Sequence, residues 1–107
     1  MRSAAKHTLP RDARDALVKL GEDIAVARKK RGISTVSMAE RAFISRNTLY
    51  QAEKGNPSVS IAVYATLLSL LGLVSRLGDV AERSKDEVGL DLDEGNLPER
   101  ITLKRRT

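Results

Sequence analysis

The sequence predicts an all-α fold, with five helices in one domain followed by an extended C-terminal tail. Three observations lead to this prediction. Apolar residues recur at intervals of three and four through most of residues 11–85, as they do along one side of an α-helix. Serine and glycine residues stand at the ends of these stretches, where caps and left-handed turns are favoured. The length of 107 residues suits one domain with a single small core.

The composition excludes several classes of protein. With Cys 0 there is no disulfide framework or thiolate metal site, and aromatic residues make up only 3%, so the core must be aliphatic. The chain has one histidine, His7, and no glycine-rich phosphate loop, so we expect no catalysis, no cofactor and no bound metal. No apolar run is long enough to span a bilayer, which predicts a soluble cytoplasmic protein. The formal net charge of +5 favours a polyanionic partner.

The first helix is expected from about Asp12 to Gly32. Residues 1–10 show no periodicity, and we interpret them as an N-terminal arm. The helix then carries one apolar stripe and ends in a basic cluster that suits the negative end of the helix dipole. The stripe consists of Leu17, Leu20, Ile24 and Ala27.

Two short helices follow, joined by a tight turn. Ser34 can cap the first, with Met38 and Ala39 facing inward, and Ser45 can cap the second, which Gly55 and the following Asn-Pro would end. The outer face of the second helix is polar, and Arg and Asn are residues that pair with guanine and adenine edges. This face predicts a recognition helix; the alternative is an ordinary polar surface helix. Its residues are Arg46, Asn47, Tyr50, Gln51 and Lys54.

The run RGISTVSMAERAFISRNTLYQAEKGNPSVS resembles the helix-turn-helix of the lambda-repressor-like, or Xre, family, and the resemblance covers about 60 of the 107 residues. The segments NPSVSIAVYATLLSLLGL and VGLDLDEGNLPERI are similar to HipB-like antitoxins, which are encoded beside HipA-like kinase toxins. The resemblance implies a compact lambda-repressor-like DNA-binding domain over residues 11–85, with the helix-turn-helix at about 34–55. It also implies a repressor of its own operon that neutralises a toxin. The alternatives are a stand-alone Xre-type regulator and a protein-interaction adapter.

The resemblance also assigns DNA contacts. It makes Arg46, Asn47, Tyr50 and Gln51 candidates for contacts to bases or phosphates, and it places Ser45 and Thr48 near the DNA backbone. Lys54 is a candidate to hold a phosphate. Thr35 stands where the family usually has a Gln that holds a phosphate, and its side chain is shorter. The implied partner is double-stranded DNA with an inverted-repeat operator.

Two further expectations concern positions beside the recognition helix. In the family the Glu of Glu-x-Gly pairs with an Arg of the first helix, which implies a structural ion pair between Arg28 and Glu53; the alternative is that both are solvated. Phe43 stands where the family commonly has a glycine with positive φ. Either the turn has a different backbone, or Phe43 is an exposed apolar anchor, or its ring folds over the edge of the core.

The fourth helix is expected to begin after Ser58 or Ser60 and to end at Gly72, and the fifth to fade at about residues 84–85. The inward stripe of the fourth helix is expected to consist of Ile61, Tyr64, Ala65, Leu68 and Leu71. Both helices carry more aliphatic side chains than a small core requires, which favours a homodimer, although such stripes are more often core. The candidate dimerisation residues are Leu70, Leu73, Val74 and Leu77.

Residues 86–107 form an acidic and then basic tail. Residues 86–95 contain five acids and no base, and Val88, Leu90 and Leu92 alternate among them, which predicts an extended segment with one apolar edge. We expect this tail to bind a basic partner surface, such as that of a HipA-like toxin kinase. The alternative is a disordered solubilising tail.

Overall fold

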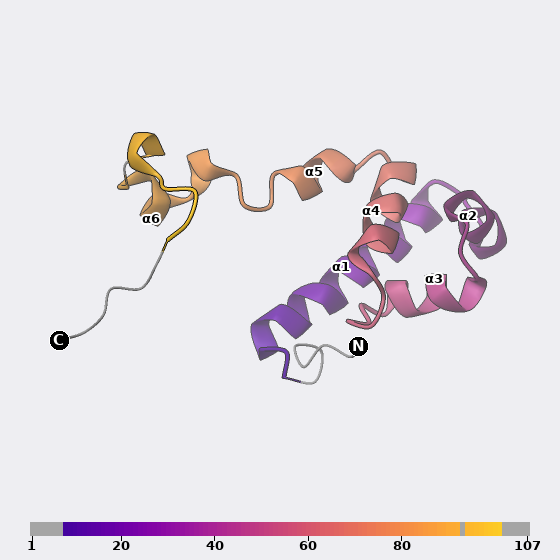
Figure 1. The fold of residues 1–107 in the computed structure, drawn as a ribbon. Coiled ribbons are helices and arrows are strands. Elements are labelled where there is room, and N and C mark those ends of the chain that lie inside the picture. Colours follow the sequence, from indigo (N-terminus) through magenta and orange to yellow (C-terminus); the bar gives the residue numbers. More distant parts are fainter. Residues whose placement is uncertain (1–7, 93, 102–107) are drawn as a thin grey trace. The chain divides into compact units, whose positions relative to one another are not determined.

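The structure is a computed structural model and describes residues 8–92 and 94–101 (Figure 1). All regular secondary structure in these residues is helical, which confirms the all-α prediction. The chain divides into two compact units, Met1–Leu77 and Gly78–Thr107. This division falls earlier in the chain than the change in composition at residue 86. Most of the expected N-terminal arm (1–7), Asp93 and the basic end of the tail (102–107) lie outside the described residues.

The first helix, α1 (Arg11–Lys30), has the extent expected from its apolar stripe. Ile24 is buried on this stripe. The helix ends in Arg28, Lys29 and Lys30, and Gly32 follows with a φ of +66°, a left-handed conformation that glycine adopts without strain. None of the helices in residues 8–92 and 94–101 combines the length and apolar character needed to cross a membrane.

Both short helices begin at the serines that the sequence indicates. The Oγ of Ser34 accepts a hydrogen bond from Ser37 N (3.0 Å) at the start of α2 (Thr35–Ala42). The Oγ of Ser45 accepts one from Thr48 N (3.0 Å) at the start of α3 (Arg46–Glu53). Each serine therefore satisfies one of the amide groups that a helix start leaves unpaired. Gly55 follows α3 with a φ of +73°.

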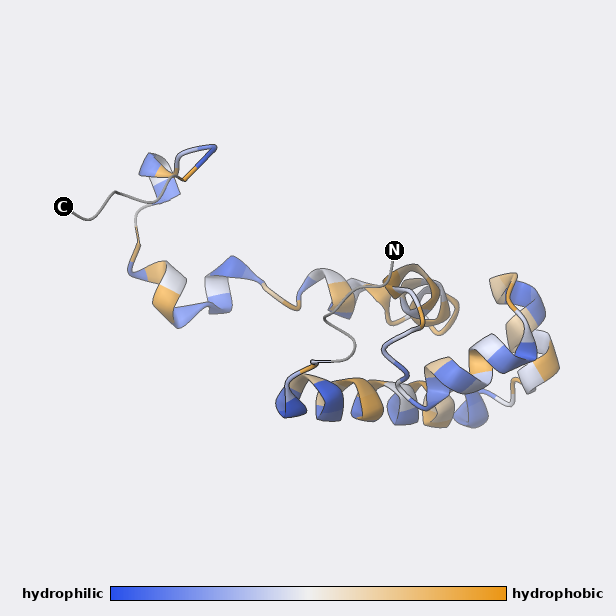
Figure 2. Cartoon of the chain, turned by 60° about the horizontal axis from the view of Figure 1, so that its bottom comes forward, coloured by the Kyte–Doolittle hydropathy of each residue, from blue (hydrophilic) through white to orange (hydrophobic). Residues whose placement is uncertain are grey.

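The fourth helix, α4 (Ile61–Leu70), starts after Ser60, whose Oγ accepts from Val63 N (3.3 Å). Hydrophobic residues occupy most of its length (Figure 2). Of its expected inward stripe, Tyr64 and Leu68 are buried, but Ile61 is 67% exposed and its placement in the core was wrong. Ile61 is the first residue after the cap, where the helix has not yet reached the packed interior.

The fifth helix is shorter than the sequence predicts. It is α5 (Val74–Gly78), and the chain then leaves the helix instead of continuing to residues 84–85. Leu73 and Leu77 pack against the core, but Val80 and Ala81 are exposed. A short helix depends on packing for its stability, so it ends where that packing ends.

The core of the first unit lies among α1, α2, α3 and α4. Its largest fully buried side chains come from all four helices, and no cysteine or tryptophan takes part. These side chains are Ile24, Met38, Leu49, Tyr64 and Leu67.

Two glycines allow α1 and the end of α3 to approach closely. A Cβ added to Gly21 would lie 2.6 Å from Gly55 N, and a Cβ added to Gly55 would overlap the carbonyl group of Leu17. Neither position can therefore carry a side chain without moving one helix away from the other. Sequence reasoning identified Gly55 only as the end of α3 and missed Gly21.

The second unit consists of η2 (Arg83–Lys85), α6 (Glu87–Leu90) and η3 (Glu94–Asn96). The prediction of an extended segment at residues 86–95 was therefore wrong. An isolated extended segment has no neighbouring strand to pair its backbone, whereas a helical turn pairs it locally, as Leu90 N does with Asp86 O (2.8 Å). The aliphatic side chains Val88, Leu90 and Leu92 are exposed.

Candidate nucleic-acid interface

The helix α3 divides into a buried and an exposed face. Leu49 and Ala52 are almost completely buried against the core. The opposite face carries exposed Arg46, Asn47 and Lys54. The 3.6-residue period of the helix places these polar side chains together because the sequence keeps its apolar residues on the other side.

An open groove of about 420 Å³ runs along α3 from its first residue, Arg46, to its last, Glu53. Thr35, the first residue of α2, lies beside Arg46 and Asn47 in its lining. The tight turn between α2 and α3 thus brings the beginnings of both helices to one surface. The complete lining is Thr35, Arg46, Asn47, Leu49, Tyr50 and Glu53.

The polar side chains of α3 differ in whether they are already bound. Within the part of the chain that the structure describes, the side chains of Arg46 and Asn47 form no hydrogen bond or ion pair. Ser45 and Thr48 are engaged in the helix cap, with their hydroxyl oxygens 2.9 Å apart. Arg46 and Asn47 therefore have all their donors, and the Asn47 carbonyl, available for a ligand.

Tyr50 and Lys54 form a pair one helical turn apart. The Lys54 ammonium lies 4.6 Å from the centroid of the Tyr50 ring, which is within the range of a cation–π interaction. Tyr50 is 54% exposed. The pair holds a positive charge and a phenol side by side on the exposed face.

Gln51 is half-buried and bound to the loop after α3. Its Oε1 accepts a hydrogen bond from Asn56 Nδ2 (2.9 Å). Sequence reasoning identified Asn56 only as part of a helix stop and missed this contact. The Asn-Pro dipeptide indicates a turn, but nothing in it indicates which side chain the Asn contacts.

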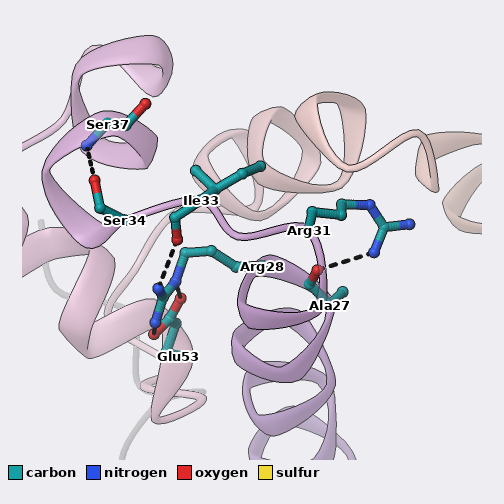
Figure 3. Close-up of polar contacts among 7 residues, drawn as sticks. All are labelled: Ala27, Arg28, Arg31, Ile33, Ser34, Ser37 and Glu53. Carbon is teal, nitrogen blue, oxygen red and sulfur yellow. Dashed lines mark hydrogen bonds and ion pairs between the residues drawn. The ribbon is translucent and has the colours of Figure 1, made fainter.

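Arg28 and Glu53 tie α1 to α3 (Figure 3). Arg28 donates from Nε to Glu53 Oε2 (2.7 Å) and from Nη2 to Oε1 (3.1 Å), while its Nη1 donates to Ile33 O (3.0 Å). The hydrogen bond with Glu53 raises the pKa of Arg28 above its usual value. A buried ion pair adds little net stability, because burial removes both charges from water, yet removing one member costs about 3–5 kcal/mol. We therefore assign to this pair the role of holding the two helices in register.

Phe43 forms the corner between α2 and α3. Its φ of 56° and ψ of 41° are left-handed, and its side chain is 96% exposed. A different backbone at this turn and a ring folded over the core are therefore both contradicted. Of the three alternatives, the exposed aromatic side chain remains.

The candidate dimerisation residues separate into two groups. Leu73 and Leu77 pack against the core of their own unit. Leu70 and Val74 are 36% and 40% exposed. Only the second group offers apolar surface to another molecule.

The C-terminal end of α1 carries exposed cations. Lys29 and Lys30 extend into solvent, and Arg31 donates from Nη1 to Ala27 O (2.9 Å).

In residues 8–92 and 94–101 no His, Asp and Glu side chains gather in a group that could hold a metal ion.

No protein-family model, no curated protein and no solved structure matches this chain.

Proposed function

We propose that this protein is a sequence-specific DNA-binding repressor of the lambda-repressor-like helix-turn-helix type, with α3 as its recognition helix. The observation that carries the proposal is the exposed start of α3, where Arg46 and Asn47 have no partner among the described residues. Unpaired Arg and Asn side chains at a helix start favour recognition of base edges. An adapter function would not require both of these side chains on one open face.

In this proposal α3 enters the major groove by its first turn. Arg46 donates two hydrogen bonds to the O6 and N7 of a guanine, and Asn47 donates to and accepts from an adenine. Thr35, beside them in the groove, donates its hydroxyl to a phosphate. Lys54 holds a phosphate through its ammonium, and Tyr50 contacts a phosphate with its phenol or a thymine methyl with its ring.

The charge distribution supports the same partner. Residues 1–31 hold nine Lys and Arg against four Asp and Glu. The exposed Lys29 and Lys30 at the end of α1 belong to this excess. Phosphate contacts of this kind make affinity fall steeply with salt, which is expected of any DNA complex of this protein.

One pair of substitutions separates base reading from phosphate holding. Arg46→Ala is expected to cost about 1–3 kcal/mol on the specific duplex and to relax the preference at particular base pairs. Lys54→Ala is expected to weaken binding to all sequences alike and to reduce the salt slope by about one unit. Affinities on a selected and a random duplex at several salt concentrations measure both effects. If Arg46→Ala loses the same affinity on both duplexes, Arg46 does not read bases.

A narrower function is the antitoxin of a HipA-like kinase. The observation that favours it over a stand-alone regulator is the separate C-terminal unit, which carries acids and exposed aliphatic side chains. DNA phosphates would repel the five acids of residues 86–95, so a protein surface is the better partner for that segment.

A further inference from the structure

Tyr50 is the one aromatic side chain on the exposed face of α3, where its neighbours are Arg, Asn, Gln and Lys. It is exposed, and it lines the groove together with Arg46 and Asn47. Leu49 lines the same groove but is almost completely buried, so it belongs to the floor. The groove therefore has an apolar wall, made of Leu49 and Tyr50, beside the two side chains that we assign to base reading.

The cation nearest to this wall lies outside the groove. The Lys54 ammonium is 4.6 Å from the centroid of the Tyr50 ring, but Lys54 is not among the residues that line the groove. A charge beside the groove suits a phosphate, which lies at the edge of the duplex and not among the bases. Lys54 thus supplies the phosphate contact here, and the part of Tyr50 inside the groove is available for a base edge.

The major groove of DNA offers one group that suits an apolar wall. Base pairs present hydrogen-bond donors and acceptors there, together with the C5-methyl group of thymine. Donors and acceptors lose hydrogen bonds to water when they meet an apolar surface, whereas a methyl group gains free energy from burial. The wall therefore fits thymine better than the other three bases.

The position of Tyr50 on α3 limits where this thymine lies. Tyr50 follows Arg46 by one helical turn. One turn advances about 5.4 Å along a helix, and base pairs follow one another about every 3.4 Å along the duplex. With α3 in the major groove, the two side chains reach base pairs about one or two steps apart.

We propose that Leu49 and Tyr50 form a binding site for the C5-methyl group of a thymine, close to the guanine that Arg46 contacts. The inference rests on the proposed DNA-binding function and gives the recognition helix a further base to specify. It also decides between the two roles of Tyr50, because the ring contacts the methyl group and Lys54 holds the phosphate. The hydroxyl of Tyr50 is then not needed for recognition.

Uracil tests this contact directly, because it pairs as thymine does and lacks only the methyl group. Selection from a random duplex library with the full chain gives the preferred site, and Arg46→Ala identifies the guanine that Arg46 reads. Each thymine of the site is then replaced by uracil, one at a time. At a thymine about one or two steps from that guanine, uracil is expected to weaken wild-type binding about fourfold, the effect of burying one methyl group.

Three variants separate the ring from its surroundings. In Tyr50→Ala, duplexes with thymine and with uracil at this position should bind equally well. Tyr50→Phe keeps the ring and removes the phenol, so it should retain both the wild-type affinity and the preference for thymine. Lys54→Ala is the control, because it should weaken binding to all duplexes and leave the ratio of thymine to uracil unchanged.

Other outcomes overturn defined parts of the proposal. If the wild type selects no motif, the DNA-binding function fails, and this inference with it. If a motif appears but no thymine shows the uracil effect, or the effect survives in Tyr50→Ala, the inference fails and DNA binding stands. Equal losses of affinity by Tyr50→Phe on selected and random duplexes would assign the phenol to a phosphate and also overturn the inference. Thermal unfolding checks that Tyr50→Ala is folded; if it is not, Tyr50→Gln, which also removes the ring, takes its place.

Discussion

Phe43 combines two unfavourable properties at one position. It occupies a left-handed conformation that costs a residue with a side chain about 1–2 kcal/mol, and its ring buries almost no surface in return. Among the described residues it is the only one other than glycine with a positive φ. A residue retained against such a cost is a candidate for a contact with another molecule.

The substitution Phe43→Gly is expected to raise the free energy of unfolding by up to about 1 kcal/mol. Glycine relieves the left-handed strain, although the greater freedom of the unfolded chain offsets part of the gain. Denaturant unfolding measures the change. Phe43→Ala is the control, because it removes the ring but keeps the strain, so it should give no such gain. A large loss of stability in Phe43→Gly would show that the ring packs against the protein.

At the scale of elements, the crossing of α1 and α3 determines where the polar face of α3 lies. The buried pair of Arg28 and Glu53 and the contact of Gly21 with Gly55 hold this crossing. The ion pair sets the register, and the two glycines set the distance. The two glycines lie away from the exposed face, whereas Glu53 of the ion pair also lines the groove beside Arg46 and Asn47.

Two glycines with similar backbones allow the crossing to be tested. Gly32→Ala and Gly55→Ala both place a side chain at positive φ, but only Gly55 has other atoms within reach of the new Cβ. Gly32→Ala is expected to cost about 1 kcal/mol from strain alone. Gly55→Ala is expected to cost about 1–3 kcal/mol more, because the Cβ overlaps the Leu17 carbonyl and forces the helices apart. Denaturant unfolding measures the loss of stability in both variants. Equal losses would mean that α1 and α3 can move apart at no cost in stability.

At the scale of the whole molecule, a single α3 reads only a few base pairs, so the proposed function requires two copies on an inverted repeat. Their recognition helices would lie about 34–36 Å apart, or a multiple of that distance. The exposed Leu70 and Val74 supply apolar surface for such a pair. Like any symmetric dimer, it would use the same patch on both copies.

The protein is therefore expected to be a dimer at micromolar concentration, as measured by light scattering. Val74→Asp should dissociate it, because a carboxylate would be buried without a partner. Val18→Asp is a matched control: Val18 and Val74 are both valines on helices and both 40% exposed. A monomer in the wild type, with or without DNA, contradicts the dimer; dissociation by both variants would indicate a nonspecific effect of the charge.

The C-terminal unit is expected to bind a toxin and not DNA. A chain that ends after Gly78 keeps α5 and should still bind its operator, but it should no longer co-purify with a HipA-like kinase encoded beside it. A full-length variant that combines Asp86→Asn, Glu87→Gln and Asp91→Asn removes three negative charges but no residues. It tests whether the charge of this segment is needed for toxin binding. Co-purification that survives truncation would place the partner site on the first unit, which contains α1 to α4 and most of α5.

Much of the fold could be predicted because its signals are local. The caps at Ser34 and Ser45 and the stop at Gly55 depend on residues within a few positions of each other. The division of α3 into Leu49 and Ala52 inside and its polar residues outside follows from helical periodicity alone. The extended tail was predicted from three alternating residues, a pattern too short to outweigh the local pairing of a helical turn.

The sequence by itself determined the all-α class, the order of α1 to α4 and the polar face of α3, because caps and periodicity act over one or two turns of chain. The tertiary structure decided where α5 ends, that Ile61 and Phe43 are exposed, and that Asn56 holds Gln51. Each of these depends on whether a neighbour from elsewhere in the chain reaches the residue. Spacing along the sequence does not record such distances, since residues far apart in the chain meet only once the helices have packed.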